Sequence, residues 1–389
     1  MTPQPFTIAI SDEVIEDLNR RLDNARGPDQ APGDPWSLGI PVTEVKAAVD
    51  YWRNKYDWRA REARMNAWPN FMTTAAGEQV HFIHARSKHA DAIPIVLTHG
   101  WPGSFVEFLD VIGPLTDPES YGGTAADAFH VVVPSMPGYG FSGPTVQPEF
   151  HVNRIADAIA EVMQQLGYDR YIAQGGDWGA IVTRRLGEAY GDRLLGIHLN
   201  MIFAFPGADD SDPMAGVTDA DNERFAAAGA RIADGTGYMA IQSTKPQTLA
   251  YGLTDSPTGL AAWILEKFNG WSDLDNNSIA DTYSWDRVLD NIMVYWVTNT
   301  VGSAARLYAE SQRANNGAAQ GWSGRVEVPT GHAQYPYELL QTPRAWAEKK
   351  YNVVYWSEQE RGGHFAAFER PEAFISDLRS FKNALSVLP

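Results

Sequence analysis

The chain has 389 residues, 44% of them hydrophobic, which is enough to bury a large core in one sizeable domain with an elaboration, or in two domains. Its net charge of -17 argues against nucleic acid and anionic membrane surfaces as partners, because both would repel the protein. The absence of cysteine excludes disulfides, thiolate metal sites and a cysteine nucleophile.

The N-terminal part is predicted to consist of helices and irregular connections. Ser11 is expected to cap one helix and Thr43 a second, with a proline-rich loop between them. The segment lacks the charged-then-apolar pattern of a signal peptide, and no stretch of the chain has the roughly 18 consecutive apolar residues of a spanning helix. We therefore expect a soluble protein whose N-terminal helices pack against another part of the chain.

Three histidines accompany the next predicted strand, Gln79–Ala85, which has the alternation of a strand: His81, His84 and His89. A metal site would need these side chains on one side. Alternation instead places His81 and His84 on opposite faces of the strand. We therefore predict surface histidines and no metal site in this segment.

Short apolar strands then alternate with helices. The strand Ile95–Leu97 precedes a glycine-rich loop, His99–Ser104, whose backbone N–H groups could supply half of an oxyanion hole. Ser104 and Glu107 have the spacing of a capping box for a helix over Phe105–Ile112. Further elements in this rhythm are the strands Phe129–Val133, Tyr171–Ala173 and Leu194–Leu199 and the helices Asn153–Leu166 and Ala180–Tyr190. The alternation predicts an α/β fold with a mostly parallel sheet and helices on both faces.

The stretch Tyr171–Gly179, with the sequence YIAQGGDWG, has the layout of a nucleophile elbow with aspartate at its crest. Glycines on both sides of Asp177 permit the tight turn that such a crest requires. A carboxylate suits attack on a saturated carbon, such as that of an epoxide or an alkyl halide, and gives an ester that water can hydrolyse. A second interpretation is that Asp177 only caps the following helix. From the turn alone, the nucleophile and the cap are equally well supported.

The segment from about Phe205 to Trp322 shows helical patterns without strand signals, and it predicts a helical lid inserted into the core. Strand patterns resume afterwards, at Arg325–Pro329 and Tyr351–Trp356. On the lid helix that includes Tyr308, the tyrosine shares a face with apolar residues and is expected to point inward. A buried tyrosine hydroxyl needs a hydrogen-bond partner.

His364 and Glu338 lie on loops that follow successive strands. Their chain order after Asp177 is the aspartate, acid, histidine order of a hydrolase triad. Singly, His364 is more often an ordinary loop histidine and Glu338 a solvated carboxylate. Their joint placement favours the triad, in which Glu338 orients the histidine.

Four stretches resemble the microsomal-type epoxide hydrolase family of the α/β-hydrolase fold, and the similarity spans nearly the whole chain. They are His99–Ser104 (HGWPGS), Gly175–Gly179 (GGDWG), Gly237–Gln242 (GYMAIQ) with Thr244–Pro246 (TKP), and Arg361–Glu369 (RGGHFAAFE). The last three are far more specific than a G-x-D-x-G pattern alone. The resemblance implies an α/β-hydrolase core with an inserted helical lid and an N-terminal meander that wraps the lid.

For the reaction, the resemblance implies a catalytic triad. Asp177 matches the nucleophile, His364 the base that activates water, and Glu338 the acid that supports this base. The expected reaction is hydrolysis of an epoxide to a vicinal diol through a covalent Asp177 ester. No cofactor or metal has a task in it.

The remaining site residues follow from the resemblance alone. Tyr238 and Tyr308 match lid tyrosines that hold the epoxide oxygen and protonate it as the ring opens. Trp101 and Trp178 match residues whose backbone N–H groups form the oxyanion hole. Residue patterns alone could not have selected these two tyrosines from the 16 in the chain.

The resemblance also sets expectations for domains, partners and location. Residues 1–85 would form the N-terminal meander, 86–204 and 325–389 the core, and 205–324 the lid. The expected substrate is a small apolar or aromatic epoxide, and a homodimer is the assembly considered. Vertebrate and insect members begin with a membrane anchor that the sequence lacks, so a soluble, cytoplasmic, bacterial member is expected.

Two alternatives stand beside an epoxide hydrolase. A haloalkane dehalogenase shares the aspartate nucleophile but needs halide-binding donors rather than acids, so paired lid tyrosines favour the epoxide. A ligand-binding protein could have kept the fold without turnover, since a fold alone does not establish activity. Such a protein is expected to have a damaged triad, whereas all three members are present here.

Overall fold

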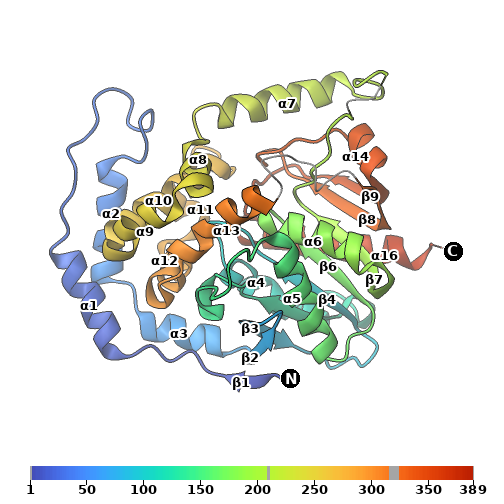
Figure 1. Cartoon of the computed structure of the whole chain (residues 1–389), viewed down its shortest axis with the longest axis horizontal. Helices are drawn as coiled ribbons and strands as arrows, with labels where there is room; N and C mark the ends of the chain where they lie inside the picture. Colours follow the sequence, from blue (N-terminus) through green and yellow to red (C-terminus); the bar gives the residue numbers. More distant parts are fainter. Residues whose placement is uncertain (1, 208–210, 315–323, 389) are drawn as a thin grey trace.

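A computed structural model describes residues 2–207, 211–314 and 324–388. Its strands are β1 (Gln4–Phe6), β2 (Asn70–Ala75), β3 (Glu78–Ala85), β4 (Ile93–Thr98), β5 (Phe129–Pro134), β6 (Tyr171–Gly175), β7 (Leu194–Leu199), β8 (Val326–Gln334) and β9 (Tyr351–Glu358). In the described part of the chain they form one sheet in the order β1-β2-β3-β5-β4-β6-β7-β8-β9 (Figure 1). From β5 to β9 every neighbouring pair is parallel, and β1 to β3 extend the sheet in antiparallel fashion. The predicted mostly parallel sheet is confirmed.

Helices cover both faces of this sheet. The core helices are α4 (Leu109–Thr116), α5 (Val152–Gln165), α6 (Trp178–Ala189), α14 (Arg344–Lys350), α15 (Ala366–Glu369) and α16 (Pro371–Ser386). A Cβ on Gly196 of β7 would meet Phe381 of α16, whereas the next residue, Ile197, faces Gly187 of α6. Because successive strand residues point to opposite faces, α6 and α16 lie on opposite sides of the sheet. Burial on both faces explains why the central strands are continuous apolar runs.

Two further groups of helices lie beside the sheet in Figure 1. The helices of the predicted lid are α7 (Asp219–Ile232), α8 (Gly237–Thr244), α9 (Pro246–Asp255), α10 (Pro257–Trp271), α11 (Ile279–Tyr283), α12 (Trp285–Thr298) and α13 (Val301–Ala314). The N-terminal helices are α1 (Asp12–Asp23), α2 (Val42–Asn54) and α3 (Trp58–Asn66). Both α1 and α2 contact α10, and α2 also contacts α12. No helix in the described ranges is long and apolar enough to cross a membrane.

Three other predictions concern the domain division, a homodimer and the cytoplasmic location, and the described residues do not decide them. Strands β2 and β3 fall within the predicted N-terminal segment 1–85, yet they pair within the central sheet. The lid segment 205–324 includes residues outside the described ranges. The division into meander, core and lid therefore stays a prediction, as do the homodimer and the cytoplasmic location.

The predicted helix caps are confirmed at Ser104, confirmed in position only at Ser11, and wrong at Thr43. Ser11 stands at the N-cap of α1 but its side chain makes no capping hydrogen bond, and Thr43 lies inside α2, whose N-cap is Pro41. The Ser104 hydroxyl accepts from the Val106 N–H, and the segment begins with a 3₁₀-helix, η1 (Phe105–Phe108), rather than the predicted α-helix. These short polar patterns are compatible with several local conformations, and tertiary packing selects among them.

The prediction of surface histidines is wrong for His81. Its side chain is fully buried, with Nδ1 2.9 Å from the Ser135 hydroxyl and Nε2 2.9 Å from Asn70 Oδ1, and burial lowers its pKa to about 3. His84 is partly buried against Tyr168. The prediction assumed that one face of β3 meets solvent, whereas β3 lies inside the sheet between β2 and β5.

The N-terminal helices are joined to the lid through one buried carboxylate. Asp290 of α12 is fully buried and accepts hydrogen bonds from the Arg61 Nε at 2.8 Å, the Tyr56 hydroxyl at 2.8 Å and the Arg64 Nη1 at 3.3 Å. All three donors lie in α3 or just before it. A buried charge is tolerated when it is paired and hydrogen-bonded in this way.

The same helix, α12, also holds the loop that follows β4. The Asn291 side-chain amide donates to the carbonyl oxygen of Pro102 at 2.8 Å, and the Tyr295 hydroxyl donates to that of Gly103 at 2.7 Å. The adjacent residue, Trp101, belongs to the candidate site. The N-terminal helices therefore support the site indirectly, through α12.

We predict that Asp290→Ala lowers the free energy of unfolding by an amount near the lower end of roughly 3–5 kcal/mol, because it leaves Arg61 and Arg64 facing a buried gap while both retain some solvent contact. Urea denaturation measures the loss. The control is Glu348→Gln, which breaks an exposed pair with Arg344 and should change stability by about 0–1 kcal/mol. Equal effects of the two variants would contradict the role of Asp290.

Candidate active site

The strand-turn-helix around Asp177 forms as the glycine pattern predicts. Asp177 follows β6, precedes α6 and has φ 51° and ψ -128°, a conformation that L-residues rarely adopt. A Cβ on Gly179 would lie 2.0 Å from the Thr98 carbonyl oxygen, and one on Gly175 would lie 2.1 Å from the Gly179 carbonyl oxygen. A strained backbone conformation such as that of Asp177 costs about 1–3 kcal/mol, and it persists only where the surrounding structure enforces it.

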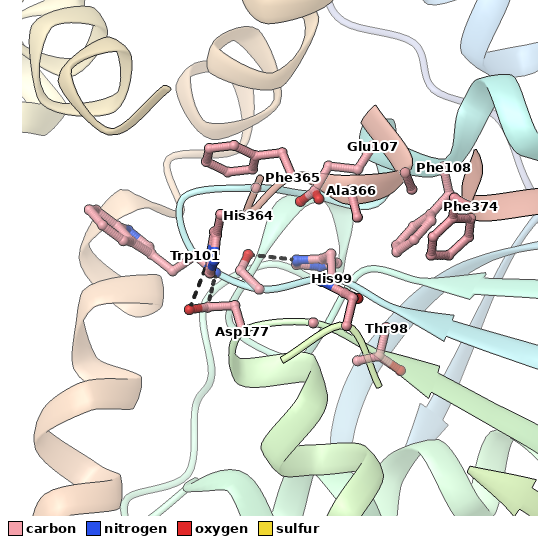
Figure 2. A pocket seen from close by; sticks show the side chains of 15 residues that line it. Thr98, His99, Trp101, Glu107, Phe108, Asp177, His364, Phe365, Ala366 and Phe374 are labelled. Carbon is pink, nitrogen blue, oxygen red and sulfur yellow. Dashed lines mark hydrogen bonds and ion pairs between the residues drawn. The ribbon is translucent and has the colours of Figure 1, made fainter. Parts of the chain in front are cut away.

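The Asp177 side chain faces away from its own helix. It makes no capping hydrogen bond with α6. Instead, Oδ1 accepts from the backbone N–H of Trp101 at 2.8 Å, and Oδ2 lies 3.4 Å from Nε2 of His364 (Figure 2). The interpretation of Asp177 as a helix cap is therefore wrong, and its carboxylate is presented to two other loops.

His364 is held from three directions. Its Nδ1 lies 2.7 Å from Oε1 of Glu338, and both side chains are only 2% exposed. Its backbone N–H donates to the carbonyl oxygen of Trp271 at the end of lid helix α10, at 2.9 Å. A parallel bridge between Tyr337 and Gly363 joins the two loops that carry the acid and the histidine.

The charge state of His364 is governed by its two carboxylate neighbours. Burial alone would lower the pKa of His364, but the charge of Glu338 and the contact with Asp177 raise it well above its ordinary value. The two carboxylates therefore favour the protonated form of the imidazole, which is a cation between two acids.

Tyr238 of α8 and Tyr308 of α13 lie above this group, in contact with both predicted tryptophans. The Tyr238 ring stacks on Trp101 with centroids 4.8 Å apart, and Tyr308 meets Trp178 edge to face at 4.7 Å. The two tyrosine rings meet edge to face at 5.9 Å. The Tyr308 hydroxyl is buried and has no hydrogen-bond partner within the described residues. Its inward orientation is confirmed, and its free hydroxyl is suited to a ligand.

Both tyrosines remain neutral donors. Burial raises the pKa of Tyr238, assisted by the negative charge of Asp177, and burial likewise raises the pKa of Tyr308 well above its ordinary value. Each phenol therefore keeps its proton at physiological pH. The pair can donate hydrogen bonds to an oxygen that develops negative charge.

A large cavity opens between Asp177 and the two tyrosines. Its volume is about 700 Å³, within the range of roughly 300–1,000 Å³ that is typical of ligand pockets. Apolar side chains dominate its wall: Val152, Trp178, Ile181, Met201, Phe203, Met239 and Leu339. The cavity thus combines a nucleophile, two donors and an apolar surround.

All seven predicted site residues are brought together around Asp177, but two neighbours had no sequence signal. Lys267 of α10 is 4% exposed and places its Nζ 4.6 Å from the centroid of the Tyr238 ring. Trp271 packs edge to face against His364 with centroids 5.0 Å apart. Both residues belong to a lid helix, and only the tertiary packing of that helix reveals their contacts.

Comparisons with known proteins agree along most of the chain. A family model described as "Epoxide hydrolase N terminus" matches residues 3–108, and one described as "alpha/beta hydrolase fold" matches residues 93–338. A Stigmatella aurantiaca protein, provisionally named as an epoxide hydrolase, is 46% identical over 96% of this chain and 83% of its own. Epoxide hydrolase 1 of Sus scrofa is 36% identical over 98% of this chain and 89% of its own. The crystal structure of juvenile hormone epoxide hydrolase from Bombyx mori superposes with a TM-score of 0.91 and 31% identity, covering 99% of this chain and 95% of that one.

We predict that Glu338→Gln and Asp177→Asn each lower the pKa of His364, and that Glu338→Gln does so more strongly because the Glu338 charge is the largest influence that raises it. NMR titration of ¹³C-labelled histidine measures the pKa in each variant, with His364→Gln used to assign the signal. The exposed control Glu348→Gln should leave it unchanged. An unaltered pKa in both site variants would contradict the proposed charge arrangement.

Proposed function

This chain belongs to the microsomal-type epoxide hydrolase family, and we propose that its epoxide hydrolysis proceeds through a covalent ester on Asp177. The observation that carries the proposal is the position of the Asp177 carboxylate, which faces the large cavity below Tyr238 and Tyr308 and lies 3.4 Å from the imidazole of His364. An attacking group, two acids and a base therefore meet at one place.

In the first step, a carboxylate oxygen of Asp177 attacks one carbon of the epoxide, and the C–O bond of the ring breaks. The departing oxygen stays attached to the neighbouring carbon and would become an alkoxide, which is a poor leaving group. Tyr238 and Tyr308 line the same cavity and donate hydrogen bonds to this oxygen, and one of them supplies its proton.

In the second step, water attacks the carbonyl carbon of the Asp177 ester and the diol leaves. Forming the ester removes the negative charge of Asp177, which is one of the influences that raise the pKa of His364. The imidazolium then passes its proton through solvent to the tyrosinate left by the first step, and the neutral imidazole, held in place by Glu338, acts as base. The backbone N–H groups of Trp101 and Trp178 stabilise the oxyanion, and the Trp101 N–H already donates to Oδ1 of Asp177.

The wall of the large cavity supports a small apolar or aromatic epoxide as substrate. Aromatic rings of Trp178 and Phe203 and the side chains of Met201 and Met239 line it. Such surfaces bury an apolar ligand, while the few convergent hydroxyl groups fix the orientation of the epoxide. Apart from the water that is consumed, both proposed steps use only side chains and backbone groups of the chain itself.

The two alternatives are less well supported. A haloalkane dehalogenase would place halide-binding donors opposite Asp177, whereas two phenols that can give up a proton stand there. A protein without turnover would not need a strained aspartate beside a histidine and acid pair joined at 2.7 Å. The named relatives are epoxide hydrolases.

We predict that His364→Gln accumulates the ester, because the first step needs no base and the second does. After incubation with styrene oxide, intact mass spectrometry should show an adduct of one epoxide, absent in Asp177→Asn. A single turnover of the unaltered enzyme in ¹⁸O water should place label in the Asp177 carboxylate. If the ¹⁸O label appeared only in the diol product and not in the Asp177 carboxylate, the two-step scheme would be overturned.

We predict that changing both Tyr238 and Tyr308 to Phe slows ester formation by roughly 10²- to 10⁴-fold, the usual contribution of general acid catalysis. Each single change should have a smaller effect, because the other hydroxyl still donates. Rapid-quench mass spectrometry in a His364→Gln background isolates this step. Tyr251→Phe, at a tyrosine that is 74% exposed, serves as the control.

A further inference from the structure

A second, much smaller cavity lies at the other side of Asp177. Its volume is about 20 Å³, and roughly 10–15 Å³ is enough to hold one water molecule. Its wall includes Asp177, His364 and Glu107 (Figure 2). Asn200 and the backbone of Gly103 also contribute to it. A water in such a space needs about two to four polar partners, and these groups provide them.

The two cavities divide the proposed reaction groups between them. Asp177 lines both. Tyr238 and Tyr308 line the large cavity. His364 lines the small cavity, and it is not among the described residues that line the large one. The groups for ester formation and the base for ester hydrolysis therefore meet at Asp177 from different sides.

Glu107 is the residue of the small cavity that the proposed mechanism has not used. It comes from η1 and is 8% exposed, and no arginine or lysine pairs with it in the described part of the chain. Burial raises the pKa of Glu107 to about 8, a rise that His364 and the Ser104 N–H oppose and Asp177 assists. A carboxyl group in this state can both donate and accept hydrogen bonds near neutral pH.

The glycine at position 103 permits this placement. A Cβ there would lie 1.5 Å from Oε1 of Glu107, so any other residue at 103 would displace the carboxyl group. Burying a carboxyl without a charged partner is unfavourable, and the contact with the Ser104 N–H offsets only part of that cost, because the pKa of Glu107 is still raised. The arrangement is therefore explained better by a task in the cavity than by stability.

On the basis of the proposed function, we propose that Glu107 is a positioning residue that binds the hydrolytic water in the small cavity, between its own carboxyl group and the imidazole of His364. The water oxygen forms a bond to the Asp177 carbonyl carbon while His364 takes one of its protons. Glu107 holds the other hydrogen and gains no net proton. The bond from the carbonyl carbon to the diol oxygen then breaks, and His364 returns its proton to that oxygen.

Glu107→Met tests this proposal, because it removes the hydrogen bonds and keeps most of the volume. With styrene oxide and rapid-quench mass spectrometry, ester formation should stay within about threefold of the unaltered enzyme. Ester hydrolysis should slow by roughly 10- to 100-fold, the range expected for a misplaced reactant, so that the ester accumulates. Glu107→Gln, which keeps polar atoms at the same place, should recover part of the rate.

The thermal midpoint of Glu107→Met should be equal to or above that of the unaltered enzyme, because a buried carboxyl is lost. A purely structural role predicts a lower midpoint and equal slowing of both steps, and that result, or unchanged hydrolysis, overturns the proposal. If Glu107→Met does not fold, Gly103→Ala applies the same test by displacing the carboxyl group. An ester absent even in His364→Gln would instead refute the proposed function.

Discussion

The site depends on one buried cation held between two carboxylates. Burial disfavours a charged imidazole, yet Glu338 and Asp177 favour the protonated form of His364. Once Asp177 becomes an ester, its support for the imidazolium is gone and only that of Glu338 remains. In the proposed mechanism the first step therefore prepares the base for the second, and no conformational change is required.

Holding these charges in place requires segments that are far apart in the sequence. The lid contributes more than a cover, because the carbonyl of Trp271 fixes the backbone of His364 and α12 fixes the loop of Trp101. Through Asp290, the same α12 binds the N-terminal helices. The N-terminal helices, the helices α10 and α12 and the loop after β4 are thus linked, so that a disturbance at the N-terminal helices can reach Trp101.

The sequence predicts the parts of the site whose local geometry is restrictive. The turn at Asp177 needs glycine where a Cβ would lie within 2.1 Å of neighbouring backbone atoms, and such a requirement is visible in the pattern itself. His364 could be located because chain order fixes where a loop after the last strand must lie. The resemblance supplied the two tyrosines. Patterns with several local solutions failed: Thr43 as a cap, and His81, whose burial depends on strands that pair from elsewhere.

Glu107 shows how much such a pattern leaves open, even though Ser104 does cap the 3₁₀-helix that follows it. Serine followed three residues later by glutamate is typical of a helix cap, and nothing local distinguishes a cap from a carboxyl that faces a cavity. The difference lies in Gly103, whose missing side chain leaves room for Oε1, and in the proximity of Asp177 and His364. In the resting enzyme the charge of Asp177 disfavours ionisation of Glu107. Esterification removes that repulsion as well, so the environment of the hydrolytic water changes at the moment when the water is needed.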